Sequence, residues 1–333
     1  MQAIKLYNLY ISNVTSHNIQ FHNIDHHLRR AESTAMATIT STPHHSIAKE
    51  IYIHLRRIGL PVQLCSIDCI SKAAKCRVYL SNFAYRNYVE QLQADTEHPD
   101  ALVYYDKTYW ANNTILANVS NAFKIVNPVP ILQKHCHLER VRVKQVLANK
   151  LLETSWEDDV KGAITRRLRK WLSHEGADEA CSRFVKIMNA QAKIVPRFVL
   201  AAFLKTVTNA WSTKGRYGAK TPCMFGCGLE GGSRVEHVME CQILHECAGL
   251  YCKNWQGWPT SGTFIDSMAI NTPPESTRAS IMLIWHDIAH QIYFGMKHSG
   301  GTPMAHTKTR IRAISRHHPR ARALLLQCYR GEG

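Results

Sequence analysis

The stretch CMFGCGLEGGSRVEHVMEC, residues 223–241, carries the strongest structural signal in this chain. Its spacing is C-x3-C-x9-H-x3-C, formed by Cys223, Cys227, His237 and Cys241. Three thiolates and one imidazole are the ligand types, and the number, that a closed tetrahedral zinc site needs. Glycines between the ligands permit the tight turns of a zinc knuckle. The sequence therefore predicts a structural Zn²⁺ site whose four protein ligands leave no position for a catalytic water.

Other residues near this stretch compete as ligands. His245, Cys247 and Cys252 follow the knuckle closely. Cys241 and His245 are four residues apart, which suits two side chains on one face of a helix. A shifted site that uses His245 or Cys247 therefore stays open, as does a cluster of thiols that binds no metal.

Composition places the chain among globular proteins of two or three compact units. It has 333 residues, of which 45% are hydrophobic and 20% charged. No run approaches the roughly 20 uncharged apolar residues that span a bilayer, so we expect no membrane span. We read no signal peptide at the amino terminus. The eleven cysteines are an odd number, which suits a reducing compartment. We expect an intracellular protein of the nucleus or cytoplasm.

Charge points to a polyanionic partner. The net charge is +16, which favours nucleic acid first and an anionic membrane surface second. Two basic runs stand out, one before the knuckle and one in the tail 297–333, which holds eight Lys or Arg and one acid. The predicted phosphate-contacting residues are Arg166, Arg167, Arg169, Lys170, Lys308, Arg310, Arg312, Arg316, Arg320 and Arg322. The alternative for each run is a solvated helical face, and complementation of a helix dipole also explains Arg166 to Lys170.

Apolar periodicity predicts a mainly α fold. Helices are expected over 42–58, 71–88, 155–170, 196–211 and 277–296, followed by two short tail helices separated at Pro319. Residues 94–130 have the composition of an irregular connector. The expected organisation is a helical unit over 1–93, the connector 94–130, and a helical unit over 131–333. This last unit contains the knuckle 223–241 and the basic tail 297–333.

The motifs of common catalytic sites are missing from the sequence. It contains no nucleophile elbow, P-loop, HExxH or dinucleotide fingerprint. Asp106 follows two tyrosines but lacks the adjacent aspartate that two-metal chemistry would use. We therefore expect a protein that is not an enzyme.

A family resemblance is carried by the knuckle and its flanks. The run ending in Asn209-Ala-Trp211, a basic spacer and residues 223–241 resemble the carboxy-terminal zinc-knuckle region of reverse transcriptases from non-LTR (LINE-like) retrotransposons. Cys223 and Cys227 match the cysteine pair of that region, and Glu236, His237 and Cys241 match its ending. The segments LRRAESTAMATITSTPHHSIA (28–48) and LRRIGLP (55–61) resemble the thumb-side helices. The helix around Trp285 and the tail RHHPRARALL (316–325) resemble the family's segment on the carboxy-terminal side of the knuckle.

The resemblance implies a thumb-like unit over 1–93 and a carboxy-terminal unit without the catalytic palm. The family carries a Tyr/Phe-x-Asp-Asp motif upstream of these regions, and this chain does not contain it. Such a fragment would bind RNA or DNA without polymerising, and a longer parent would supply the polymerase. The alternatives are a zinc-stabilised protein-interaction module and an orphan transposon-derived fragment without selected activity.

Overall fold

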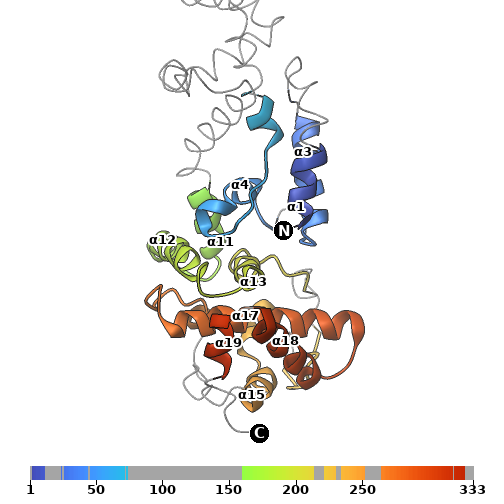
Figure 1. Cartoon of the computed structure of the whole chain (residues 1–333), viewed down its shortest axis with the longest axis vertical. Helices are drawn as coiled ribbons and strands as arrows, with labels where there is room; N and C mark the ends of the chain where they lie inside the picture. The colour runs from blue at the N-terminus through green and yellow to red at the C-terminus, as the bar shows by residue number, and fades with distance from the viewer. Residues whose placement is uncertain are drawn as a thin grey trace, which may run out of the picture. The chain divides into compact units, whose positions relative to one another are not determined.

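The part of the chain that can be described is mainly α, as predicted (Figure 1). The computed structural model describes residues 2–11, 24, 26–43, 46–71, 73, 160–213, 221–229, 234–251, 264–317 and 319–326. Within these ranges the chain forms helices and turns but no β-strand. The predicted connector 94–130 and most of the predicted helix 71–88 lie outside the described residues.

The chain divides into two compact units. One comprises Met1–Thr40, Tyr52–His54 and Val62–Val160, and the other comprises Ser41–Ile51, Leu55–Pro61 and Lys161–Gly333. The second unit thus includes two short segments that the sequence analysis assigned to the first helical unit. Whether a connector begins at 94 and ends at 130 stays a prediction.

The first unit is built around a buried carboxylate. Its elements are α1 (Gln2–Leu6), the π-helical turn η1 (Tyr7–Ile11) and α3 (His26–Ile39). Glu32 of α3 is buried and accepts hydrogen bonds from the Tyr7 hydroxyl (3.1 Å) and the Ile67 backbone N–H (2.8 Å). The Asn8 side chain accepts a bond from the Cys65 backbone N–H at 2.9 Å. These bonds tie the amino-terminal turn to α3 and to the segment around residues 65–67.

The helix expected from residue 42 begins later than predicted. The observed elements are α4 (Lys49–Ile53) and the 3₁₀ turn η2 (Leu55–Ile58). The backbone N–H and hydroxyl of Ser46 both donate to the Pro43 carbonyl, at 3.1 and 2.6 Å, so a local turn takes the place of a helix start. The predicted stop at Gly59 is observed, with φ +82°. A Cβ at Gly59 would lie 2.6 Å from the Met188 carbonyl oxygen, so this position admits only glycine without rearrangement.

Nine α-helices are described in the segment Lys161–Gly333 of the second unit. They are α11 (Gly162–Leu168), α12 (His174–Gln191), α13 (Arg197–Val207), α14 (Val235–Glu240), α15 (Gln242–Tyr251), α16 (Phe264–Ser267), α17 (Thr277–Ser299), α18 (Pro303–His317) and α19 (Pro319–Leu326). The predictions for α13 and α17, and for two tail helices that meet at Pro319, are confirmed. The predicted helix 155–170 is described only from residue 160, and α11 begins at Gly162.

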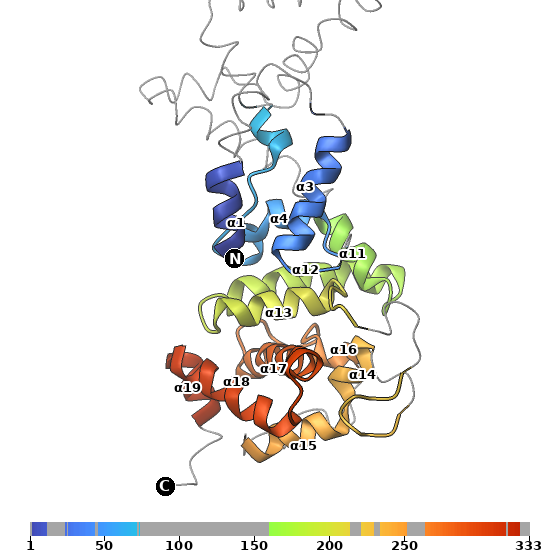
Figure 2. The same cartoon turned by 90° about the vertical axis from the view of Figure 1, so that its right-hand side faces the viewer.

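The longest described helix, α17, forms the centre of this unit. It packs against α12, α13, α14, α18 and α19, and Figures 1 and 2 show it between α13 and α15. Trp285 of α17 and Trp211, just after α13, are fully buried. None of the described helices, including the 23-residue α17, is long and apolar enough to cross a membrane. The knuckle helix α14 and the basic helix α18 both pack against this core around α17.

Candidate metal centre and basic surface

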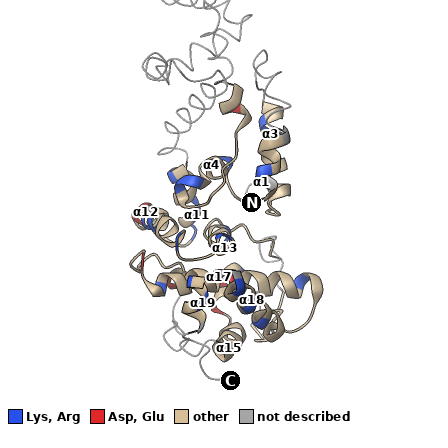
Figure 3. Cartoon of the chain, viewed as in Figure 1, with Lys and Arg blue, Asp and Glu red and all other residues tan. Residues whose placement is uncertain are grey.

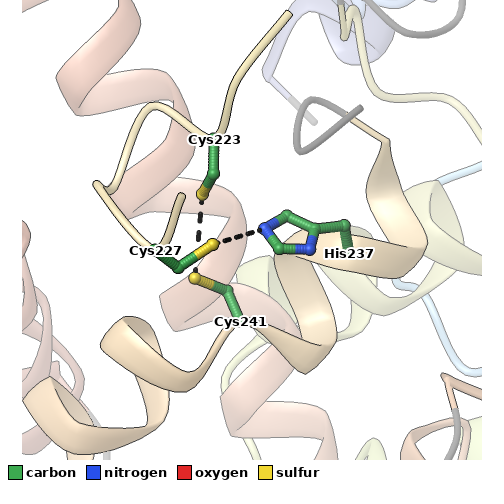
Figure 4. A group of neighbouring side chains, drawn as sticks. All are labelled: Cys223, Cys227, His237 and Cys241. Carbon is green, nitrogen blue, oxygen red and sulfur yellow. Dashed lines mark hydrogen bonds between the residues drawn. The ribbon is translucent and has the colours of Figure 1, made fainter. Parts of the chain in front are cut away.

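The four predicted ligands converge on one point (Figure 4). Cys223 and Cys227 lie in the loop 221–229, His237 lies on α14, and Cys241 lies between α14 and α15. Their ligand atoms all lie within 4.8 Å of one another, an arrangement that can hold a metal ion. The sequence spacing and the three-dimensional arrangement therefore name the same four side chains.

The cysteine loop is shaped by its own backbone bonds. The Gly226 N–H donates to the Cys223 carbonyl and the Cys223 N–H to the Leu229 carbonyl, each at 3.1 Å. Gly226 and Gly228 have φ +88° and +78°, which a residue with a Cβ rarely adopts. The Phe225 N–H also points at the Cys223 Sγ, at 3.4 Å. The loop thus turns both thiols inward and gives each of them a backbone donor.

The second half of the centre comes from one helical turn and its end. His237 and Cys241 are four residues apart, so they lie on the same side of the chain. Cys241 leaves the helical conformation, with φ −64° and ψ 117°. Its carbonyl accepts the His245 N–H at 3.1 Å, which starts α15. The change of direction between α14 and α15 therefore coincides with a ligand.

Two distances within the cluster are close to those of a tetrahedral zinc site. Two sulfurs, each about 2.3 Å from one zinc ion, lie about 3.8 Å apart, and a sulfur and an imidazole nitrogen about 3.5 Å apart. The Cys223 and Cys241 Sγ atoms are 3.8 Å apart, and the Cys227 Sγ lies 3.3 Å from His237 Nε2. The protein therefore offers the spacing of a zinc site.

Burial controls the protonation of these ligands. Burial raises the pKa values of the Cys223 and Cys241 thiols. Burial also acts against the Cys227 thiolate, but hydrogen bonds, first that from the Leu229 backbone, outweigh it and lower the Cys227 pKa. Burial lowers the pKa of His237, which keeps its imidazole in the neutral form that binds metals. A metal ion would displace the thiol protons on binding.

The competing ligands have other positions. The His245 Nε2–H donates to the Met239 carbonyl at 2.9 Å, and the His245 ring packs on Trp285 with 4.6 Å between centroids. Cys247 is buried, and among the described residues the metal-capable group contains neither of the two. Cys252 lies outside the described residues.

The basic run on and after α11 is only partly available to a ligand. Arg166 and Arg169 are exposed, and Arg167 is half-buried. Lys170 is exposed but forms an ion pair with Glu236 of the knuckle helix, with 2.5 Å between Nζ and Oε1. Glu236 matches the family pattern, but no residue near it in the sequence indicates this partner.

The basic residues of α18 face two different ways. Lys308, Arg312 and Arg316 are exposed, and none of them forms an ion pair within the described part of the chain. Arg310 instead faces the core, where its Nε and Nη2 donate to the two carboxylate oxygens of buried Asp287 at 2.6 and 2.7 Å. Figure 3 shows blue basic positions along α18 and no red acidic ones. Arg310 is thus engaged inside the protein.

On α19, Arg320 and Arg322 are both exposed. Arg320 Nη1 donates to the Lys193 carbonyl at 3.0 Å, while its other guanidinium nitrogens make no hydrogen bond recorded for the described residues. Asp287, which the sequence analysis did not single out, is the only acidic residue of α17. A single acid in an apolar helix, followed by a helix rich in arginine, was the sequence pattern that could have predicted a buried pair.

The second unit therefore presents a four-ligand centre and an exposed basic face. The centre brings together four ligand atoms, the number that a tetrahedral metal site uses, and the exposed cations lie on a helix that contains no acid. Comparisons with protein families, with curated proteins and with solved structures found no match to this chain.

Proposed function

We propose that this chain binds RNA or DNA without catalysing a reaction on it, and that a structural zinc ion holds its knuckle. This is also the expectation raised by the resemblance to the carboxy-terminal region of non-LTR retrotransposon reverse transcriptases. The observation that carries the proposal is the exposed basic face of α18, defined here by Lys308, Arg312 and Arg316.

The spacing of this basic face suits a row of phosphates. Successive members are four residues apart, so each step advances about 6 Å along the helix and about 40° around it. All three therefore lie on one side, opposite buried Thr307, Ile311 and Ile314. Neither α18 nor α19 contains an acid to neutralise them. Cations that are exposed and unpaired bind a polyanion by releasing its counterions.

Zinc is the metal that the ligand set favours. Soft thiolates together with imidazole in a tetrahedral arrangement select zinc over the hard cations calcium and magnesium. With four protein ligands the site has no open position, so its role is to hold the fold.

Binding measured as a function of salt tests the proposal. Anisotropy of labelled single-stranded RNA and DNA, titrated with the zinc-loaded chain, is expected to show affinity that falls linearly with salt on logarithmic axes. Replacing Lys308, Arg312 and Arg316 together by Gln is expected to reduce the slope by about 2, at about 0.7 for each lost single-strand contact. The matched control replaces the exposed Lys186, Arg197 and Arg278 by Gln, an equal change of charge. Binding that is independent of salt, or equal slopes for the two triple variants, would refute the proposal.

A zinc-stabilised protein-interaction module is the second candidate. Two exposed leucines favour it, Leu229 in the cysteine loop (60% exposed) and Leu250 on α15 (66% exposed). Replacing both by Ser would leave nucleic-acid affinity unchanged under the first proposal. A chain that retains zinc but binds no nucleic acid at any salt concentration would favour this second candidate or the orphan fragment.

A further inference from the structure

The knuckle helix α14 is too short to be stable by itself. It has six residues, whereas isolated helices below about 12 residues are marginal in water. Its conformation therefore depends on what its side chains contact. His237 and the adjoining Cys241 face the metal centre, while the two glutamates Glu236 and Glu240 have partners elsewhere in the unit.

These glutamates belong to a closed ring of contacts. Glu236 Oε1 accepts hydrogen bonds from Lys170 Nζ (2.5 Å) and Trp171 Nε1 (2.8 Å). The Trp171 ring packs on Phe264, with 4.9 Å between centroids. The Phe264 N–H in turn donates to Glu240 Oε1 at 2.5 Å, which closes the ring. The short helix α14 thus supplies His237 to the four-ligand group on one face. On another face it contacts Lys170 and Trp171, which follow α11.

We infer that metal occupancy at the four-ligand centre controls the position of Lys170 and Trp171, with Glu236 as the link. The inference rests on the proposed zinc centre. With the metal bound, α14 is helical and Glu236 lies where both donors reach it. Without the metal, the four ligands lose their common partner and α14 loses a main support. The hydrogen bonds of Glu236 to Lys170 and Trp171 are then lost.

The consequence concerns the basic surface. In the described conformation, which we assign to the metal-bound state, Lys170 is paired with Glu236, so Arg166 and Arg169 are the exposed cations of that run that make no ion pair within the described residues. Loss of the metal frees the Lys170 charge and the Trp171 indole together. The centre would then report zinc availability to the surface that we propose contacts phosphates.

Three buried apolar residues and two hydrogen bonds oppose this release. Val235, Val238 and Met239 are buried, and the Met239 carbonyl accepts hydrogen bonds from Trp285 Nε1 at 3.3 Å and from His245 Nε2–H at 2.9 Å. If these contacts were sufficient, α14 would keep its conformation without metal. The experiment therefore has to compare the protection of residues 169–171 in the zinc-loaded and the metal-free chain.

Hydrogen exchange of the full chain makes this comparison. Metal analysis first establishes one equivalent of zinc, and exchange is then followed by mass spectrometry before and after addition of a chelator. We expect the amides of residues 169–171 and 235–240 to exchange at least about tenfold faster without zinc, the effect of losing one charge-assisted hydrogen bond. The interior of α17 is the internal reference and is expected to be unchanged.

A matched pair of variants identifies the link. Glu236→Ala is expected to retain one equivalent of zinc and to show fast exchange at 169–171 with or without chelator. Glu246→Ala, which removes an exposed carboxylate of α15 bonded to Gln242, is expected to behave as the original chain. Chelation that opens 235–240 and leaves 169–171 protected would overturn the coupling, and so would faster exchange throughout α17. A chain that takes up no zinc would overturn the zinc centre and the coupling together, and metal analysis identifies that case before any exchange is measured.

Discussion

Cys223 is the residue through which the proposed metal centre is best tested at the level of single residues. Its Sγ lies 3.8 Å from that of Cys241, and replacing the thiol by a hydroxyl leaves three ligands. We expect Cys223→Ser to lower zinc affinity by more than about 100-fold, since even changes behind the ligands lower affinity 10- to 100-fold. Zinc release, followed with a colorimetric indicator, measures this change.

The control for that variant is a second buried cysteine of the same region. Cys247 is buried but outside the metal-capable group. Cys247→Ser is expected to retain one equivalent of zinc. The reverse result, with zinc lost from Cys247→Ser and kept by Cys223→Ser, would indicate a shifted site.

Arg310 gives a prediction about stability. Asp287 is almost completely buried, and burial raises its pKa while the Arg310 guanidinium acts in the opposite direction. Arg310→Met would leave this carboxylate without its partner, which costs about 3–5 kcal/mol. The double variant Asp287→Leu with Arg310→Met removes both charges and is expected to recover most of that loss. Urea unfolding compares them, and a double variant as unstable as the single one would contradict the expectation.

Spacing along the chain identified four residues that the structure brings together as a group that could hold a metal ion. They could be named because their separation along the chain limits where they lie. Arg310 and Arg312 look equivalent in composition, yet one faces the core and the other solvent. Their angular positions around the helix relative to Ile311 and Ile314 distinguish the two arginines. A list of basic residues does not include this information. The Glu236 partnership is formed by residues 66 positions apart, and no local pattern signals it.

At the level of elements, α17 provides the clearest test. Ser276 is its N-cap, and its Oγ accepts the Ala279 N–H at 3.1 Å. Ser276→Ala is expected to destabilise the fold by about 1 kcal/mol, because this N–H loses its acceptor. The control is Ser182→Ala on the exposed face of α12, which removes only a bond to the preceding turn and is expected to change stability by less than about 0.5 kcal/mol. Equal losses in thermal or urea unfolding would count against a capping role.

Elements were predictable where apolar periodicity was long and ended by a clear signal. Pro196 precedes α13, Pro319 separates α18 from α19, and the apolar face of α17 runs almost its full length. The start of α4 was misplaced because Thr42-Pro43 fits a helix N-terminus, while Ser46 forms a turn with Pro43 instead. No prediction was made for α12, although Ser173 caps it by accepting the Gly176 N–H.

For the whole molecule, two buried histidines predict acid sensitivity. Burial lowers the pKa of His286 to about 4 and that of His290 to about 3, with Lys205 and Arg310 adding to the effect at His290. The unfolded chain takes up these protons near pH 6.5, whereas the folded chain does not. Stability is therefore complete above about pH 6.5 and falls as pH decreases toward 4, by up to about 1.4 kcal/mol per pH unit for each histidine.

Unfolding curves between pH 7 and pH 4 test this dependence. His286→Gln is expected to flatten it by about one proton. Comparing variants with the original chain cancels the proton uptake of the metal centre. An unchanged slope in His286→Gln would contradict the assignment.

The division into units was the least predictable feature. Residues 55–61 belong with 161–333 because of contacts such as that from the Asn189 side chain to the Arg57 carbonyl, at 2.8 Å. The two partners are 132 positions apart, and a local sequence pattern relates only residues that are close along the chain. Helix content was therefore predictable from the sequence, and the grouping of helices was not.

The Arg310–Asp287 pair also fixes the rotation of α18 about its own axis. A helix whose apolar side is narrow can turn about its own axis at little energetic cost, and a shift of one residue corresponds to about 100°. A two-point bond to a buried carboxylate permits one angle only, since any other leaves that carboxylate unpaired. Among the three arginines of α18, Arg310 is the one that turns toward the core, and its pairing with Asp287 keeps Lys308, Arg312 and Arg316 on the solvent side of the helix.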